Sequence, residues 1–176
     1  HGGRPVERGV AIVTQSSNIM INLTMQQRGL PIAYALTAGN QAQTSLADLG
    51  RAVLDDPRVT ALGLHIEGIG ELADFEDLAR HASACKKGIV ALKVGRSAQA
   101  QQATISHTAS LTGSNASADA LLSRLGIARV DGLTEMVEAL KILHYHGPLA
   151  GKNLVSASCS GGEASLLADT AEIQGK

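Results

Sequence analysis

The stretch VTALGLHIEGIGELADFEDLARHASACKKGIVALKVG, Val59–Gly95, holds the pattern that decides the fold. A short apolar run leads into a glycine-rich turn, an amphipathic segment with acidic residues near its start follows, and a second apolar run closes the stretch. Short apolar runs bounded by turn residues are typical of buried strands, and acidic side chains favour the first turn of a helix because of its dipole. The stretch therefore predicts a strand, a helix and a second strand.

The same alternation extends to both sides of this unit. Further strands are expected at residues 9–14, 30–40 and 127–130, and further helices at 19–29, 44–57, 115–126 and 132–146. Short strands that alternate with helices indicate a parallel sheet, and right-handed crossovers place the helices on both faces. We expect an α/β fold, a three-layer flavodoxin-like parallel sheet over residues 9–146, preceded by an N-terminal linker at residues 1–8.

The last part of the chain repeats the pattern in shorter form. HGPLAGKN reads as a linker because of its Gly and Pro residues, and LVSASCSGGEASLLADTAE then reads as a strand, a Ser/Gly turn and a helix. Residues 147–176 are therefore expected to be a linker and the truncated start of a second flavodoxin-like domain. The chain begins with His1 rather than Met, so we expect it to be a piece of a longer polypeptide.

Composition narrows the class of protein. The chain is 44% hydrophobic and 18% charged with a net charge of −1, and this balance gives no basic excess for nucleic acid. Aromatic residues make up only 2%, which favours an aliphatic core. No apolar run approaches ~20 residues, so no membrane span is expected. Cys85 and Cys159 form no motif and are expected to be reduced thiols, so we expect a cytoplasmic protein.

Three loops that follow predicted strands carry candidate site residues, because ligands of such sheets collect at the carboxyl ends of the strands. The first loop places Ser16, Ser17 and Asn18 at the start of a helix. Helix N-termini offer unpaired backbone N–H groups that suit an anion such as phosphate. Plain N-capping without a ligand is the alternative, and neither GxxxxGK[ST] nor GxGxxG is present.

The second loop carries Glu67 in HIEGIG, and the third carries His107 in SHTASLTGS. Glu67 alone is equally compatible with a solvated loop residue or a helix-capping partner. His107 is compatible with a structural residue, a metal ligand, a general base or a carrier of a transferred group.

A metal site is not expected from the spacing of the remaining candidate ligands. Neither a shared histidine spacing nor a cysteine pair accompanies His107; the other histidines considered are His65, His81, His144 and His146. A metal hydrolase that uses His65, Glu67 and His107 remains a weaker alternative.

Together the three loops suggest a phosphoryl site. A neutral imidazole nitrogen is a nucleophile, and a carboxylate bound to its other nitrogen fixes the tautomer and the orientation of the ring. Helix-end amides can receive the anionic group that the ring takes up. His107, Glu67 and the helix start near Ser16 supply these parts if they meet at one edge of the sheet.

Several segments resemble one known family. TAGNQAQTSLADLGRAVLDDPRVTALGLHIEGIGELADFEDLARHA, GIVALKVGRSAQAQQATISHTASLTGS and GIARVDGLTEMVEALKIL resemble the NDP-forming acyl-CoA synthetases of the ADP-forming acetate–CoA ligase type, which are relatives of the succinyl-CoA synthetase α subunit. The most specific part is K.GRS…SHT..L.GS downstream of IEGI. The resemblance extends from about Val6 to the end of the chain.

The resemblance implies an activity and roles for individual residues. In the family an acid, CoA and ATP are converted reversibly to acyl-CoA, ADP and phosphate through an acyl phosphate and a phosphohistidine. By motif His107 matches the phosphorylated histidine and Glu67 the carboxylate that orients it. The positions that match the phosphate-binding turns are Ser16, Ser17, Asn18, Gly39, Asn40, Ser106 and Thr108. Gly161 and Gly162 match a second helix start, for which plain capping is the alternative.

The chain departs from the family pattern at two places. The family loop usually reads SHTGALAGS, where this chain has Ala109, Ser110 and Thr112, and the family's first helix-start turn often contains SGG or SQSG, where this chain has Ser17 and Asn18. Fewer glycines narrow the expected approach to the phosphate.

The family also implies cofactors and partners. CoA and ATP/ADP with Mg are expected to bind mainly to a CoA-binding Rossmann domain and an ATP-grasp domain outside this chain, and a small carboxylic acid is the expected substrate. The whole protein is expected to be a homo- or hetero-oligomer, and the fragment alone is not expected to turn over. A non-catalytic relative that binds acyl-CoA or a partner is the alternative.

Overall fold

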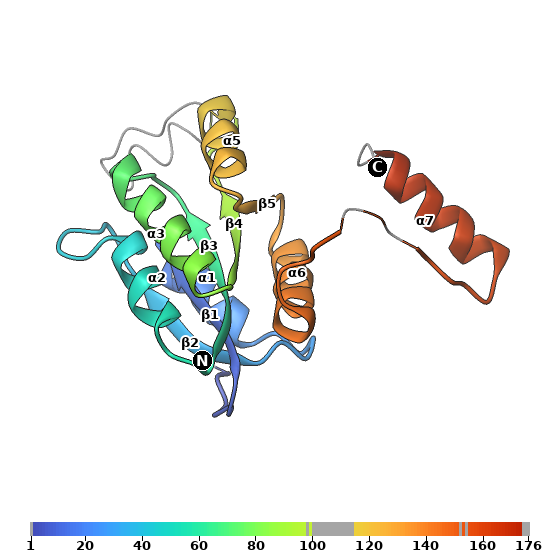
Figure 1. Ribbon diagram of the computed structural model, residues 1–176, viewed down its shortest axis with the longest axis horizontal. Coiled ribbons are helices and arrows are strands. Elements are labelled where there is room, and N and C mark those ends of the chain that lie inside the picture. The colour runs from blue at the N-terminus through green and yellow to red at the C-terminus, as the bar shows by residue number, and fades with distance from the viewer. Residues whose placement is uncertain (1, 98, 100–114, 152, 154, 174–176) are drawn as a thin grey trace.

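Five parallel strands form the centre of the molecule in a computed structural model that describes residues 2–97, 99, 115–151, 153 and 155–173 (Figure 1). The strands are β1 (Gly9–Thr14), β2 (Ile32–Thr37), β3 (Val59–Ile66), β4 (Gly88–Lys93) and β5 (Ala128–Val130). Their order in the sheet is β2-β1-β3-β4-β5, and all neighbouring pairs are parallel. This is the flavodoxin-like order, so the predicted fold class is confirmed.

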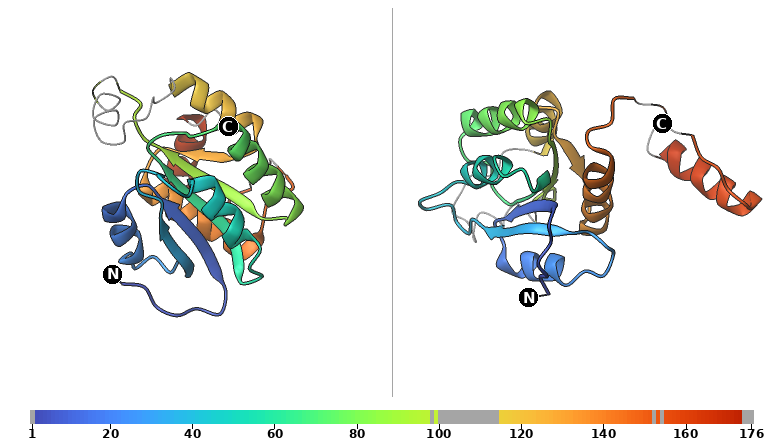
Figure 2. Two further views of the ribbon diagram at one scale, coloured as in Figure 1. Left: turned by 90° about the vertical axis from the view of Figure 1, so that its left-hand side faces the viewer. Right: turned by 60° about the horizontal axis from the view of Figure 1, so that its bottom comes forward.

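Helices cover both faces of the sheet (Figures 1 and 2). The bounds are α1 (Ser17–Thr24), α2 (Leu46–Leu54), α3 (Leu72–Ala84), α5 (Asn115–Arg124), α6 (Leu133–His146) and α7 (Gly161–Ile173). Apolar residues of α2, α3 and α5 pack on one face, and those of α1 and α6 pack on the other. Ser45 caps α2, and Ser45 and Asp48 form a capping box there.

The central strand β3 shows how the two cores are divided. Leu62, Leu64 and Ile66 belong to the core beneath α2 and α3, whereas Ala61 belongs to the core beneath α1 and α6. Gly63 lies on the α6 side, where an added Cβ would come within 2.7 Å of Met136 Cε. From Ala61 onward, the alternation thus places odd-numbered residues of β3 toward α6.

Helix α1 is shorter than its sequence pattern predicts. We expected it to stop at Gly29, but it ends at Thr24. The Gln26 side chain accepts a hydrogen bond from Arg28 N and donates one to Leu30 O at 3.0 Å, which stabilises an irregular turn instead of another helical turn. Side chains that bond to nearby backbone groups compete with helix in this way.

The C-terminal part of the chain stands away from the sheet (Figures 1 and 2). Helix α7 confirms the predicted helix, but the described residues between Gly147 and Ser160 contain no strand, and Val155 is 93% exposed. A strand needs a neighbouring strand to pair with, and none lies beside this segment among the described residues. Within the described part of the chain, no helix has the length and apolar character needed to cross a membrane.

Candidate functional site

Gln15 joins two of the predicted loops at the carboxyl edge of the sheet. It follows β1 directly and is only 7% exposed. Its Oε1 accepts hydrogen bonds from Glu67 N and, at 2.9 Å, from Gly68 N, while its Nε2 donates to Gly68 O at 2.9 Å. The turn that carries Glu67 is therefore bonded to the turn that opens α1.

The turn after β2 reaches the same point. Gln41 Nε2 donates to Gly68 O at 3.5 Å, and Gln41 Oε1 accepts from Leu46 N at 2.8 Å. Gly39 has a φ of +55°, which glycine adopts without strain, and Asn40 Oδ1 accepts from Ala42 N at 3.2 Å. The predicted Gly39–Asn40 turn thus lies next to the Glu67 turn.

Lys93 connects the Glu67 turn to the end of β4. It is 4% exposed, and its Nζ donates to Glu67 O at 2.9 Å and to Val94 O at 2.5 Å. Burial lowers the pKa of Lys93, the nearby charge of Arg129 lowers it further, and Glu67 opposes both effects. A buried ammonium with two carbonyl partners strongly fixes the position of the Glu67 turn relative to the end of β4.

Arg129 binds the far end of the segment that connects β4 to α5. The segment between β4 and α5 begins at Val94 and returns at Asn115. The Arg129 side chain is 10% exposed, and its Nη2 donates to Asn115 Oδ1 at 2.5 Å. Both ends of the segment that carries His107 are therefore bound to the carboxyl edge by buried cations.

His65 adds a buried imidazole one residue before the end of β3. It is 3% exposed, and its odd position places it on the α1 and α6 side of the sheet. Its Nδ1 has no hydrogen-bond partner among the described residues. Burial lowers the pKa of His65, and the negative charge of Glu67 opposes this shift, so the ring is neutral at neutral pH.

The start of α1 presents backbone amides, as expected of an anion site, and Ser16 is used as its cap. Ser16 Oγ accepts from Ile19 N at 3.4 Å, and the first turn contains no acidic residue. Ser17 and Asn18 are exposed. Capping and anion binding are compatible here, because a cap satisfies one of the amides and leaves others for a ligand.

The remaining predicted residues are not at this edge or lie outside the described residues. Ser106, His107 and Thr108 belong to the second group. Gly161 and Gly162 are exposed at the start of α7, away from the sheet, where Ser160 Oγ accepts from Glu163 N at 3.2 Å (Figure 1). The structure therefore does not bring these two glycines to the Glu67 turn.

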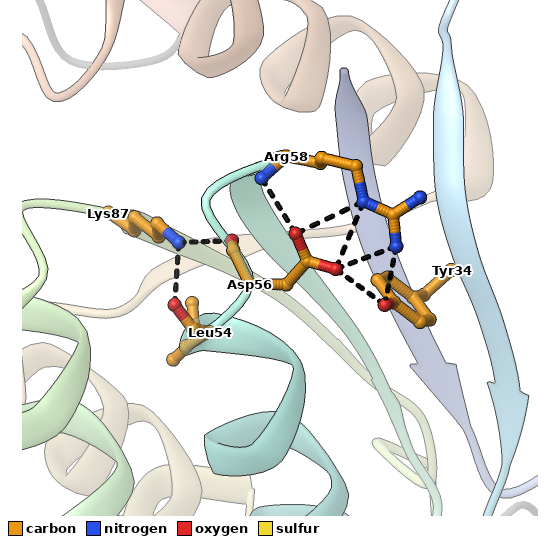
Figure 3. A network of polar contacts seen from close by, with 5 residues as sticks. All are labelled: Tyr34, Leu54, Asp56, Arg58 and Lys87. Carbon is orange, nitrogen blue, oxygen red and sulfur yellow. Dashed lines mark hydrogen bonds and ion pairs between the residues drawn. The ribbon is translucent and has the colours of Figure 1, made fainter. Parts of the chain in front are cut away.

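The amino edge of the sheet, where the strands begin, carries a different polar network (Figure 3). Arg58 Nη2 donates to Asp56 Oδ2 at 2.7 Å and to Tyr34 Oη at 2.8 Å, and Tyr34 Oη donates to Asp56 Oδ2 at 2.6 Å. The bonds from Arg58, followed by that from Tyr34, hold the pKa of Asp56 well below its usual range. The Arg58 side chain is 54% exposed, so this network is a surface feature.

A family model and known relatives match this chain. The model described as the succinyl-CoA ligase-like flavodoxin domain matches residues 7–143. The chain is 29% identical to a trans-feruloyl-CoA synthase from an unknown prokaryotic organism over 167 residues, which cover 94% of this chain and 24% of that protein. It is also 29% identical to the α subunit of ADP-forming acetate–CoA ligase I of Pyrococcus furiosus, covering 94% of this chain and 36% of that subunit.

A solved structure also resembles the structure of this chain. The dinucleotide-forming acetyl-coenzyme A synthetase 1 of Ca. Korarchaeum cryptofilum, in complex with phosphate and ADP, superposes with a TM-score of 0.84 at 25% identity. The match covers 98% of this chain and 38% of that one. The chain thus spans between a quarter and two fifths of the length of these relatives. Because the family model matches well over half of its residues, the chain belongs to the succinyl-CoA ligase-like flavodoxin domain family.

Proposed function

We propose that this chain is the phosphohistidine-carrying part of an NDP-forming acyl-CoA ligase. The observation that carries the proposal is the Glu67 turn, which Gln15 and Lys93 hold beside the start of α1 and beside Val94, at the end of β4. Family membership supports the same reaction class, since the relatives are named as CoA ligases and synthases.

The proposed step transfers a phosphoryl group to and from His107. A ring nitrogen of His107 attacks the phosphorus of an acyl phosphate, an N–P bond forms, and the P–O bond to the acyl oxygen breaks as the carboxylate leaves with the electron pair. In the second half, an oxygen of ADP attacks the same phosphorus and the N–P bond breaks. Glu67 accepts the hydrogen bond of the other ring nitrogen and stabilises the positive charge that develops on the ring.

The described residues supply orientation and electrostatics for this step. The amides at the start of α1 offer hydrogen-bond donors to the phosphoryl oxygens, and the N-terminal end of the helix carries partial positive charge. Gln15 and Lys93 bind the backbone on both sides of the Glu67 carboxylate, so they act as positioning residues. Positioning and electrostatic stabilisation provide most of the catalysis in phosphoryl transfer.

Further substrates and domains complete the proposed reaction. The carboxyl edge offers amides that suit a phosphoryl group and a carboxylate that suits the imidazole ring. We assign CoA, ATP/ADP with Mg and most of the acid site to other domains or subunits. We therefore expect the isolated chain to be inactive in the full reaction. The acid remains open, because the relatives are named for different ones.

The test is phosphorylation of the intact ligase from both substrate directions. The protein is incubated with γ-labelled ATP and Mg, or with acyl-CoA and labelled phosphate, and is then quenched. We expect acid-labile, base-stable label on the chain from either direction, discharge of that label by ADP, and its loss in a His107→Asn variant.

The outcome also separates the proposal from the alternative of a non-catalytic relative. A binding or regulatory protein would bind acyl-CoA without acquiring label from either direction. Label that persists in His107→Asn would place the phosphoryl group elsewhere and overturn the assignment of His107.

A further inference from the structure

Three potential metal ligands meet at the amino edge of the sheet, on the other side of the molecule from the Glu67 turn. They are a carboxylate, an imidazole and a thiol from Asp55, His81 and Cys85, and their ligand atoms all lie within 4.8 Å of one another. His81 Nε2 lies 2.8 Å from Asp55 Oδ1 and 3.7 Å from Cys85 Sγ. The spacing of histidines alone did not reveal this group, because Asp55 comes from a different helix.

The fold creates the cluster by placing two helix ends together. Asp55 is the C-cap residue of α2, and Cys85 is the C-cap residue of α3. His81 precedes Cys85 by four residues, so the two side chains share one face of the last turn. Helices α2 and α3 pack side by side on the same face of the sheet, which brings Asp55 beside that turn (Figure 1).

We propose that Asp55, His81 and Cys85 form a binding site for a divalent metal of the zinc type. Bond lengths of zinc to imidazole nitrogen and thiolate sulfur in a tetrahedral site place these two atoms about 3.6 Å apart. The separation of 3.7 Å between His81 Nε2 and Cys85 Sγ fits this value. The carboxylate oxygen needs to move outward by only about 0.5 Å to reach tetrahedral spacing from the imidazole nitrogen.

The exposure of the ligands suits a site with an open position. The Asp55 side chain is 70% exposed and that of His81 is 33% exposed, so a water molecule can complete the coordination. Three protein ligands and one water are the arrangement of zinc sites that keep an open coordination position. On binding, the Cys85 thiol loses its proton to the buffer as the metal–sulfur bond forms, and the imidazole binds through the Nε2 lone pair.

The electrostatic surroundings contain one favourable and one opposing contribution. The partial negative charge at the C-terminal ends of α2 and α3 favours a cation. Lys87 already uses this field, since its Nζ donates to Leu54 O at 2.5 Å and to Asp56 O at 2.8 Å (Figure 3). Its positive charge opposes the metal, whereas the charges of one thiolate and one carboxylate neutralise a divalent ion.

The experiment titrates the metal-free 176-residue chain with zinc chloride by calorimetry and with cobalt chloride by absorption spectroscopy. The fragment is suitable because the residues of the sheet domain bury their own core. We expect one zinc ion per chain and a thiolate-to-cobalt absorption band. Cys85→Ser and Asp55→Asn should each weaken zinc binding at least tenfold, and Cys85→Ser should abolish the band.

The matched control is Cys159→Ser, because Cys159 is the other free cysteine and is exposed. It should bind zinc as the parent does and keep the cobalt band. Absence of zinc binding overturns the proposal, and so does binding that Cys85→Ser and Asp55→Asn leave unchanged. Unfolding curves of the metal-free variants show whether each keeps the parent fold, and the exposed Asp55 provides the variant least able to disturb it.

Discussion

Both edges of the sheet carry polar side chains, but those that bind the Glu67 turn at the carboxyl edge are more deeply buried than Arg58 and Asp55 at the amino edge. Gln15 and Lys93 are 7% and 4% exposed and bind the backbone of the Glu67 turn. At the amino edge, the side chains of Arg58 and Asp55 are 54% and 70% exposed. Buried hydrogen bonds fix positions because losing a partner leaves a desolvated group, whereas water replaces a lost partner at the surface. The comparison teaches that burial distinguishes the candidate catalytic edge.

The largest difference between the edges should appear in phosphoryl transfer. Glu67→Gln removes the carboxylate that we assign to the orientation of His107, so phosphorylation of the intact ligase by ATP should slow by roughly 10²- to 10⁴-fold. Asp56→Asn changes a carboxylate at the other edge and should leave the rate within about a factor of two. Rapid-quench measurement of the phosphorylation rate checks both.

Equal rates for the parent and Glu67→Gln would remove Glu67 from the mechanism. Equal losses in both variants would show that the effect comes from stability rather than from the carboxyl edge.

The two edges should also differ in how much the free energy of unfolding falls when a polar side chain is replaced by an apolar one of similar length. Gln15→Met leaves two amides of the Glu67 turn without their partner and leaves Gly68 O with only the longer bond from Gln41, which should lower the free energy of unfolding by about 2 kcal/mol. Arg58→Met removes exposed hydrogen bonds and should lower it by less than Gln15→Met does. Urea unfolding of both variants measures the two values, and a larger loss for Arg58→Met would reverse the comparison.

A buried histidine makes the carboxyl edge sensitive to pH. The folded state holds the pKa of His65 below its ordinary value of 6.5, chiefly because of burial. As the pH falls below that value, the unfolded chain takes up the proton first, so stability declines with a slope of at most about 1.4 kcal/mol per pH unit for this one group. Between about pH 7.5 and about pH 5.5, the free energy of unfolding of His65→Leu should therefore change less than that of the parent.

A parent and a His65→Leu variant with parallel stability curves would show that His65 does not contribute. His144→Gln is the comparison variant at the amino edge. Burial lowers the pKa of His144 as it does that of His65, and the His144 side chain bonds Thr60.

The smallest effect should be the same at both edges. Gly39 and Gly126 have φ of +55° and +67°, and an added Cβ would meet no atom within 4 Å at either position. Each substitution by Ala should cost about 1 kcal/mol, because the strain comes from the backbone and not from burial. Thermal unfolding of the two variants checks this, and a clear difference would mean that the surroundings of the turns also contribute.

Much of the fold could be predicted from the sequence because local pattern and global structure agree. Apolar runs such as Gly9–Thr14 and Gly88–Lys93 became the buried strands, and the helix expected at residues 44–57 formed as α2, Leu46–Leu54. The prediction was wrong where a local pattern depended on an unseen partner. Gln26 ended α1 early through its own hydrogen bonds. The segment before α7 forms no strand among the described residues, and the second domain to which we assigned it stays a prediction.

The candidate site could be predicted only in outline. The rule that ligands collect at strand ends pointed to Glu67 and the α1 start, and the structure places these two turns together through Gln15. The positioning residues Gln15, Gln41 and Lys93 were missed, although a lysine that ends a buried strand was a usable signal. The carbonyls that Lys93 binds depend on the register of β3 and β4, and this register cannot be read from a single sequence.

The metal-ligand cluster shows the same division between local and tertiary information. The spacing of His81 and Cys85 was visible in the sequence as two positions one helical turn apart. Asp55 lies on another helix, and only the packing of α2 against α3 brings it within 2.8 Å of the imidazole.

The most direct test of the central claim is to map the phosphate on the intact ligase. After reaction with ATP and Mg and quenching in base, peptide mass spectrometry should locate the phosphoryl group on the imidazole of His107, at near one equivalent per chain. Phosphate found on another residue, or none on a ligase that still forms acyl-CoA, would contradict the assignment of this carboxyl edge as the phosphohistidine site.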